Sequence, residues 1–226
     1  RGTWQDYFKE YYSRYSHDKE KASPGYYQVE LLTHNINVEL TTTTRAGFHR
    51  YTFPKSDSAT VLIDLGFTRN WDQPVATGIS LKNDSTITGF RHSKGWAPNQ
   101  KVFFAARFSK PLKDVKLLND SGKWVKDVTS LSSKATKAII TYRTEAQETI
   151  LAKVGISSVS GQQALTNLDQ EIPGWNFDGV QQQAHDAWQK QLGQIQVSSA
   201  DTANLTKFYT AFYRTLLTPN PFSDVD

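Results

Sequence analysis

The stretch Thr77-Gly78-Ile79-Ser80-Leu81-Lys82-Asn83-Asp84-Ser85-Thr86-Ile87-Thr88-Gly89-Phe90-Arg91 contains two short segments of mixed apolar and polar residues on either side of three turn-forming residues. Segments 77–82 and 86–91 have the length and β-branched content of strands. Asn, Asp and Ser favour the tight backbone of a turn. The stretch therefore predicts two strands joined by a turn. The same pattern returns over 113–118 and 123–127, around the turn sequence Asn119-Asp120-Ser121-Gly122.

Short strands separated by turns extend outward from there, over about Tyr26 to Ser157. We expect further strands at 101–109, 135–143 and 147–156, and a run of apolar residues at Thr60–Leu65 indicates a central strand covered on both faces. No helical period occurs before residue 160, so the helical crossovers of a parallel sheet are missing. Some ten strands without helices predict a mainly β fold, an antiparallel β-sandwich of the supersandwich type.

The apolar period changes to that of helices after Ser157. We expect a short helix at 161–169, a second with the apolar stripe Phe177, Val180, Ala184, Trp188 and Leu192, and a third with the stripe Leu205, Phe208, Tyr209, Phe212 and Leu216. Ser198, three residues before Asp201, predicts the start of the third helix, and Pro219 its end. This helix either folds back onto the sandwich or opens a larger helical domain beyond Asp226. Too few helices are available to cover its wide stripe, which favours the second interpretation.

Composition excludes several classes of protein. Hydrophobic residues make up 38% and aromatic residues 12% of the 226 residues, more than a disordered chain carries. No apolar run approaches the roughly 20 residues of a membrane span. The net charge is +4, and residues 101–143 hold ten Lys or Arg against three Asp. These charges alternate with apolar residues, as on a solvated sheet face, and no recognition motif accompanies them, so we expect no nucleic-acid partner.

The absence of cysteine excludes disulfides, thiol catalysis and thiolate metal sites. Nucleophile-elbow and zinc-protease motifs are also missing. The chain begins at Arg1 without a Met or a leader, which suggests a segment of a longer polypeptide.

Two stretches carry residue types that suit a binding site. In 16–27, His17 and Glu20 lie close enough in sequence to act as acid, base or ligand, although a polar loop entering the first strand would contain the same residues. In 89–96, Arg91 and Trp96 could hold a sugar, because the apolar face of a pyranose stacks on indole while cations donate to its hydroxyls. The alternative for this stretch is a strand-end turn with a packed tryptophan.

Several motifs in the chain, taken in order, resemble glycoside hydrolase family 92. They are Ser16-His17 to Glu20 with Ala22-Ser23-Pro24-Gly25-Tyr26-Tyr27, Thr44-Arg45-Ala46-Gly47-Phe48-His49-Arg50-Tyr51-Thr52-Phe53-Pro54, Gly89-Phe90-Arg91 with Gly95-Trp96-Ala97, Phe108-Ser109-Lys110-Pro111, Val154-Gly155-Ile156-Ser157, and Tyr213-Arg214-Thr215-Leu216-Leu217. The resemblance covers about residue 11 to the end. It implies an N-terminal β-sandwich domain at 1–158, a helical linker at 159–197, and at 198–226 the first helix and connection of a catalytic (α/α)6 barrel.

The resemblance further implies an inverting, calcium-dependent exo-α-mannosidase that acts on N-glycans or mannans, with an expected preference for α-1,2 bonds, and that is secreted, periplasmic or on the cell surface. The catalytic domain of the same polypeptide and a mannose-containing glycan are its partners. The acid, base and calcium ligands of the family belong to the barrel, so we expect no catalytic or metal residue here. His17, Glu20, Arg91 and Trp96 are predicted to contact sugar at the domain junction, and Asp224 and Asp226 come from the first connection of the barrel. The alternatives are a free-standing carbohydrate-binding module, a purely structural domain that stabilises the barrel, and the sandwich domain of another (α/α)6 glycosidase or phosphorylase.

Overall fold

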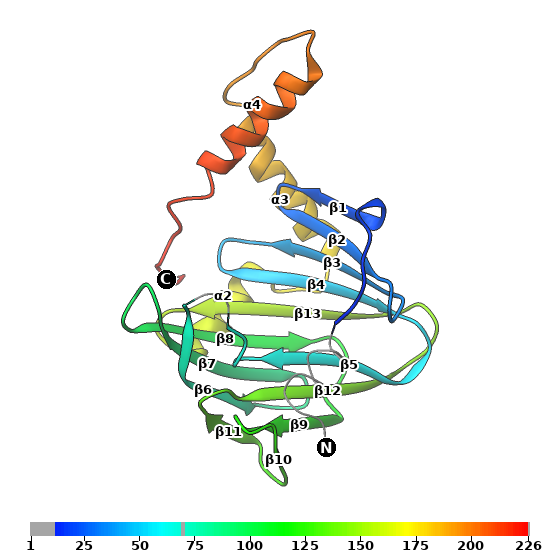
Figure 1. Cartoon of the computed structure of the whole chain (residues 1–226), viewed down its shortest axis with the longest axis vertical. Coiled ribbons are helices and arrows are strands. Elements are labelled where there is room, and N and C mark those ends of the chain that lie inside the picture. The colour runs from blue at the N-terminus through cyan, green and yellow to red at the C-terminus, as the bar shows by residue number, and fades with distance from the viewer. Residues whose placement is uncertain (1–11, 69–70, 226) are drawn as a thin grey trace.

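The structure is a computed structural model and describes residues 12–68 and 71–225 (Figure 1). Two antiparallel sheets lie face to face in this part of the chain, and helices follow them. The larger sheet has nine strands in the order β1-β2-β3-β4-β13-β8-β7-β6-β11. In that order they span Glu20–Ser23, Tyr26–Leu31, Ile36–Thr42, Ala46–Phe53, Glu148–Ser157, Gln100–Phe108, Thr86–Lys94, Gln73–Leu81 and Ser130–Ser133. A single 3-10 turn, η1 (His17–Lys19), precedes β1.

The smaller sheet has four strands in the order β10-β9-β12-β5. They span Trp124–Val125, Asp114–Leu118, Lys137–Thr144 and Ser56–Asp64. Both stretches that the sequence predicted as paired strands are antiparallel pairs: Gly78 of β6 faces Phe90 of β7, and Leu118 of β9 faces Trp124 of β10. The predicted antiparallel sandwich is confirmed.

The prediction of a central strand at 60–65 is wrong, because β5 forms the edge of the smaller sheet. Val61 and Ile63 pack into the core between the sheets. Leu62, on the opposite side of the strand, lines a groove together with Leu31 and Ile36 of the larger sheet. The run is apolar on both sides because this groove, rather than a second neighbouring strand, shelters its outer residues.

The larger sheet is covered on both faces. One face packs against the smaller sheet around Phe53, Ile79, Phe104, Ile140 and Ile150. The other face packs against helices α2 (Gly161–Glu171) and α3 (Phe177–Leu192), through Phe48, Leu168, Ile172, Phe177 and Val180. At Gly155 of β13 a Cβ atom would lie 2.3 Å from the carbonyl oxygen of Ala164 in α2. Glycine there lets the helix lie directly on the strand.

The predicted helices at 161–169 and over the Phe177–Leu192 stripe are confirmed. The predicted start of the last helix at Ser198 is wrong, because α4 spans Thr202–Thr215 with Asp201 as its N-cap. The Asp201 carboxylate accepts hydrogen bonds from the backbone N–H groups of Ala203 and Asn204. A cap that satisfies two free donors places the start of the helix directly after Asp201, at Thr202.

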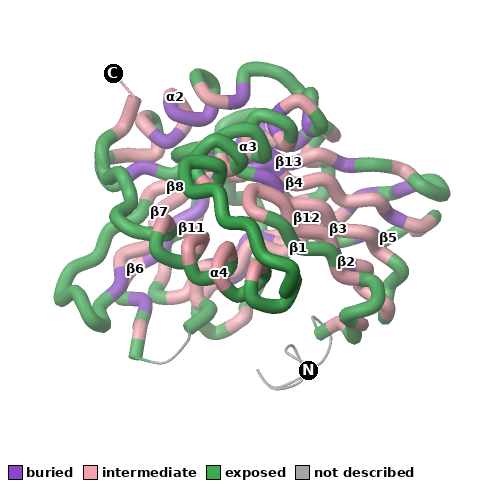
Figure 2. Tube along the Cα trace, turned by 90° about the horizontal axis from the view of Figure 1, so that it is seen from above, coloured by how far each residue is buried: buried purple, intermediate pink, exposed green. Residues whose placement is uncertain are grey.

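Helix α4 stands away from the sandwich, and none of its residues is buried (Figures 1 and 2). It meets α3 through Trp188 and Tyr213, whose ring centroids lie 4.8 Å apart. The interpretation that this helix folds back onto the sandwich is therefore wrong. No helix in the described residues has the length and apolar character needed to cross a membrane.

Candidate functional site

Arg91 holds the segment that leads into β6. Its guanidinium donates to the carbonyl oxygens of Leu65 (3.0 Å) and Phe67 (3.2 Å) and forms an ion pair with the carboxylate of Asp72. The hydrogen bond from Arg91 holds the pKa of Asp72 below its ordinary value. Arg91 is thus bonded within the chain and fixes the backbone beside Trp71, instead of being aimed at solvent.

Trp96 lies in the loop between β7 and β8 and is 90% exposed. The alternative of a packed tryptophan in a turn is therefore wrong for this side chain. A second tryptophan, Trp71, lies beside the loop and is 62% exposed. The two indoles, with Gln73, Lys94, Gly95 and Pro98, line an open cavity of about 610 Å³. Trp71 carries no signal in the sequence, because it lies in an irregular segment without a period.

His17 and Glu20 form a separate cluster at the edge strand β1. His17 Nδ1 lies 2.6 Å from Glu20 Oε2, and the Tyr27 hydroxyl donates to Glu20 Oε1 at 2.6 Å. The hydrogen bonds from Tyr27 and His17 keep the pKa of Glu20 below its ordinary value. The bond between Tyr27 and Glu20 also raises the pKa of Tyr27 to about 12. A carboxylate stabilised in its ionised form is poorly suited to donate a proton near neutral pH.

The structure does not bring the four predicted residues together. Strands β2, β3, β4, β13 and β8 lie between β1 and β7. At about 4.8 Å per strand, six spacings separate β1 from β7 by roughly 30 Å across the sheet. Trp96 lines the open cavity and Arg91 is bonded to Asp72 beside it, whereas His17 and Glu20 form a separate cluster.

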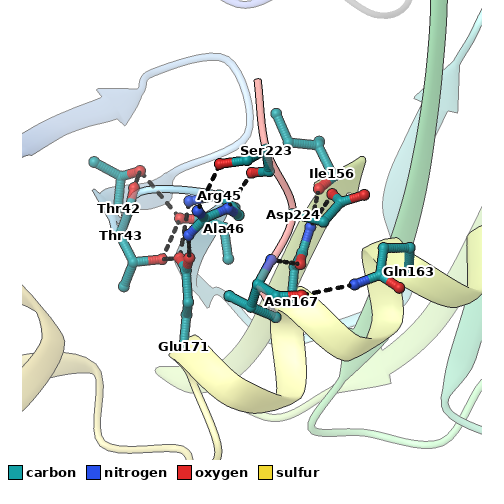
Figure 3. Close-up of polar contacts among 11 residues, drawn as sticks. Thr42, Thr43, Arg45, Ala46, Ile156, Gln163, Asn167, Glu171, Ser223 and Asp224 are labelled. Atoms are coloured by element: carbon teal, nitrogen blue, oxygen red, sulfur yellow. Dashed lines mark hydrogen bonds and ion pairs between the residues drawn. The ribbon is translucent and has the colours of Figure 1, made fainter. Parts of the chain in front are cut away.

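A third group of polar residues fastens the C-terminal segment to the end of the larger sheet (Figure 3). Arg45, in the turn between β3 and β4, pairs with Glu171 at the end of α2 (2.8 Å) and donates to the carbonyl oxygen of Ser223. Thr43 also donates to Glu171. Burial alone would raise the pKa of Glu171, but the hydrogen bonds from Thr43 and Arg45 outweigh it and hold the pKa below its ordinary value.

Asn167 is the centre of the same attachment. Its side chain is fully buried, and its amide donates to the carbonyl oxygen of Ile156 (2.8 Å) and to Asp224 Oδ1 (2.7 Å). Its own oxygen accepts from the backbone N–H of Val225 at 3.0 Å. Ser157 donates to the other oxygen of Asp224 at 2.8 Å. Asp224, which the family resemblance places in the first connection of the barrel, is thus tied to the sandwich in this structure. Asp226 lies outside the described residues.

The loop between β7 and β8 lies at the same end of the sandwich as this attachment. A cavity of about 370 Å³ beside the C-terminal segment is lined by Gln100, Lys101 and Val102 of β8, together with Asn220 to Asp224. Trp96 precedes β8 by only a few residues. The exposed tryptophans and the path of the chain after α4 therefore lie on the same end of the sheet.

The residues described do not offer an evident cation site. Across 12–68 and 71–225, no three His, Cys, Asp or Glu residues lie close enough to hold a metal ion together. Glu20, Glu171 and Asp224 are each bonded to other side chains. Because calcium takes six to eight oxygen ligands, with carboxylates prominent among them, these residues do not fit the ion.

Comparison with known proteins agrees with this architecture of a sandwich followed by helices. The model of the glycosyl hydrolase family 92 N-terminal domain matches residues 1–157, and the model of the family 92 catalytic domain matches residues 163–226. The chain belongs to glycosyl hydrolase family 92, and contains its N-terminal domain and the start of its catalytic domain.

Solved structures of the family share the fold over 94% or more of this chain. The family GH92 α-mannosidase BT3965 from Bacteroides thetaiotaomicron is 37% identical, with a TM-score of 0.92, and the match covers 100% of this chain and 31% of that one. The inverting mannosidase BT2199 from the same organism is 24% identical over 96% of this chain and 29% of its own, with a TM-score of 0.85, and supports the fold alone. A curated relative named "Uncharacterized secreted glycosidase", from Arthroderma benhamiae, is 28% identical over 92% of this chain and 30% of its own length. The chain thus spans about 30% of the length of these relatives.

Proposed function

We propose that this chain is the non-reacting N-terminal part of an exo-α-mannosidase that cleaves terminal α-mannosidic bonds of N-glycans or mannans, α-1,2 bonds foremost, with inversion of configuration. The sandwich (1–158) and the helical linker (159–197) support a catalytic domain that opens at 198–226, and the sandwich supplies part of the sugar-binding cleft. The activity named for the similar BT3965 enzyme supports this proposal. Calcium dependence is part of this proposal and follows from the family resemblance alone. Export from the cytoplasm is also part of it, and the name of the Arthroderma benhamiae relative supports it.

The observation that carries the role in sugar binding is the exposure of Trp96. An indole that is 90% exposed on a short loop loses apolar burial unless something covers it. Arg91 supports the site indirectly, through its bonds to the segment before Trp71 and to Asp72. His17 and Glu20 lie far from this site, so a direct contact of theirs with the same sugar has less support.

An inverting glycosidase needs two carboxyl groups roughly 6.5–9.5 Å apart, one to protonate the leaving oxygen and one to activate water. The carboxylates at the two sites and at the C-terminal attachment are each bonded to another side chain. They are Glu20, Asp72, Glu171 and Asp224. We therefore assign the acid and the base to the part of the polypeptide that this chain does not include. The residues here hold the cleft in shape and contact sugar that does not react.

Family membership bears on the rival functions. A free-standing carbohydrate-binding module would not continue into 163–226 as a match to a catalytic domain. A phosphorylase would require phosphate for bond cleavage, which a hydrolase does not. Phosphate-independent release of mannose by the longer polypeptide therefore separates the two enzyme classes.

Trp96→Ala in the longer polypeptide tests the role of Trp96. We expect kcat/KM for an α-mannoside to fall about tenfold, the effect of losing one stacking contact, while the melting temperature changes by less than about 2 °C. Trp124→Ala, which removes a tryptophan that is 51% exposed on β10, is the matched control for the kinetics and should leave kcat/KM unchanged. A large fall in melting temperature with unchanged kinetics would show that Trp96 packs against another domain and does not bind sugar.

A further inference from the structure

We propose that Lys116 and Lys126, held against the indole of Trp124, bind an acidic glycan, that is, a polysaccharide in which single anionic groups are separated by neutral sugars. The three residues lie on and beside strands β9 and β10, at the end of the molecule opposite α4 (Figure 1). This inference goes beyond the proposed function and does not depend on it.

The strand pair places these side chains on the outer face of the smaller sheet. Val115 and Leu117 pack into the core between the sheets, so Lys116, which lies between them on β9, points to the opposite face. Trp124 of β10 faces Leu118 of β9, two residues beyond Lys116. The indole and the lysine are therefore diagonal neighbours on one face, a spacing that lets long side chains touch. Trp124 is 51% exposed, so a ligand can reach this face.

Two cations are held at this one indole. The ammonium nitrogen of Lys126 lies 5.2 Å from the ring centroid of Trp124, and that of Lys116 lies 5.3 Å from it. Because the face of an aromatic ring attracts a cation, the indole fixes both lysines before any ligand arrives. Fixing the donors in advance lowers the cost of ordering them on binding.

No carboxylate balances these two charges in the described part of the chain. The lysines that form ion pairs there are Lys19, Lys55, Lys110 and Lys137. Lys116 and Lys126 thus repel each other without a compensating anion. An anionic group bound between or beside them would remove this repulsion, so the site is electrostatically complementary to such a group.

The surroundings of the two lysines indicate the kind of anion. Three carboxylates, Asp114, Asp120 and Asp127, lie in the same stretch of sequence. They would repel a polymer as densely charged as DNA, which carries one charge per about 1.7 Å of its axis. The β9–β10 turn, residues 119–122, has no apolar side chain that could enter a bilayer. The exposed indole instead offers an apolar surface to a sugar ring, so a glycan with separated anionic groups suits the site.

Binding of the longer polypeptide to immobilised hyaluronan, which carries one carboxylate per two sugars, tests this site. The double variant Lys116→Gln/Lys126→Gln should raise Kd roughly tenfold or more, and added salt should weaken binding of the original protein. Trp124→Leu, which keeps an apolar side chain but removes the ring, should raise Kd about threefold or more. The matched control is Lys82→Gln/Lys134→Gln, which removes two exposed lysines outside β9 and β10 and should leave Kd within about twofold.

An equal loss of affinity in the control pair would show that only net charge matters, and would contradict the site. Absence of binding to hyaluronan, or binding that the Lys116 and Lys126 changes leave intact, would also contradict it. Equal or tighter binding to poly-L-glutamate, or to vesicles that contain phosphatidylserine, would overturn the assignment to a glycan. Because binding is measured without turnover, the result is independent of whether the longer polypeptide cleaves α-mannosides.

Discussion

Asn167→Ala removes the side chain that joins α2, β13 and the C-terminal segment. Asn167 is fully buried and makes three hydrogen bonds: to the carbonyl oxygen of Ile156, to the carboxylate of Asp224, and from the backbone N–H of Val225. Alanine keeps the helix but can replace none of these bonds. The partner groups then lie partly buried without their polar contact.

The magnitude follows from the kind of each bond. Two bonds join neutral groups, at about 0.5–1.5 kcal/mol each, and the third joins a carboxylate, at about 1.5–3 kcal/mol. Together they give roughly 2.5–6 kcal/mol. A domain of about this size loses roughly 2–4 °C of melting temperature per kcal/mol, so a loss near 4 kcal/mol corresponds to a fall of about 12 °C.

Thermal unfolding of the 226-residue chain, followed by circular dichroism, measures this change. Gln170→Ala is a matched control, because Gln170 lies on the same helix and is exposed, and it should move the midpoint by less than about 2 °C. A midpoint for Asn167→Ala equal to that of the control would refute the reasoning that these bonds fasten the C-terminal segment to the sandwich.

Two further predictions concern the packing of α2 and its end. Gly155→Ala places a Cβ atom against the helix backbone and should lower stability by about 1–3 kcal/mol or more, whereas Gly174→Ala, with no atom within 4 Å of the added carbon, should change it little; chemical denaturation compares them. Glu171 has a lowered pKa, so its contribution to stability is fully present above pH 4.5 and is lost as the pH falls through the lowered value. Glu171→Gln should therefore be less stable than the original chain at pH 7, and the difference should shrink in acid; a difference that is constant with pH would contradict the assigned role of Thr43 and Arg45.

Much of the fold could be predicted from local signals. The Asn83 and Asn119 turns and the stripe from Phe177 to Leu192 are decided by residues close in sequence, so they were predicted with nearly correct bounds. The position of β5 was not, because a run such as Val61-Leu62-Ile63 is equally apolar in a central strand and beside a groove lined by distant residues. Which strand forms an edge depends on long-range pairing.

The candidate site was predicted less completely for the same reason. Trp96 could be found because it ends a cationic stretch between Gly89 and Gly95, but nothing local distinguishes Trp71, which reaches the site only through the pairing of β6 with β7. Grouping His17 and Glu20 with Arg91 required the strand order, which no period gives. Asn167 carried one usable signal, a polar residue next to the buried Leu168 of a helix, yet its partners Asp224 and Val225 lie 57 and 58 residues away along the chain.

Release of free mannose tests the central claim most directly. An α-1,2-linked mannobiose would be incubated with the 226-residue chain and, separately, with the longer polypeptide, each with calcium and with a chelator. The account predicts mannose only from the longer polypeptide with calcium, because the proton-transferring groups lie outside this chain. Calcium-dependent turnover by the 226 residues alone would contradict it.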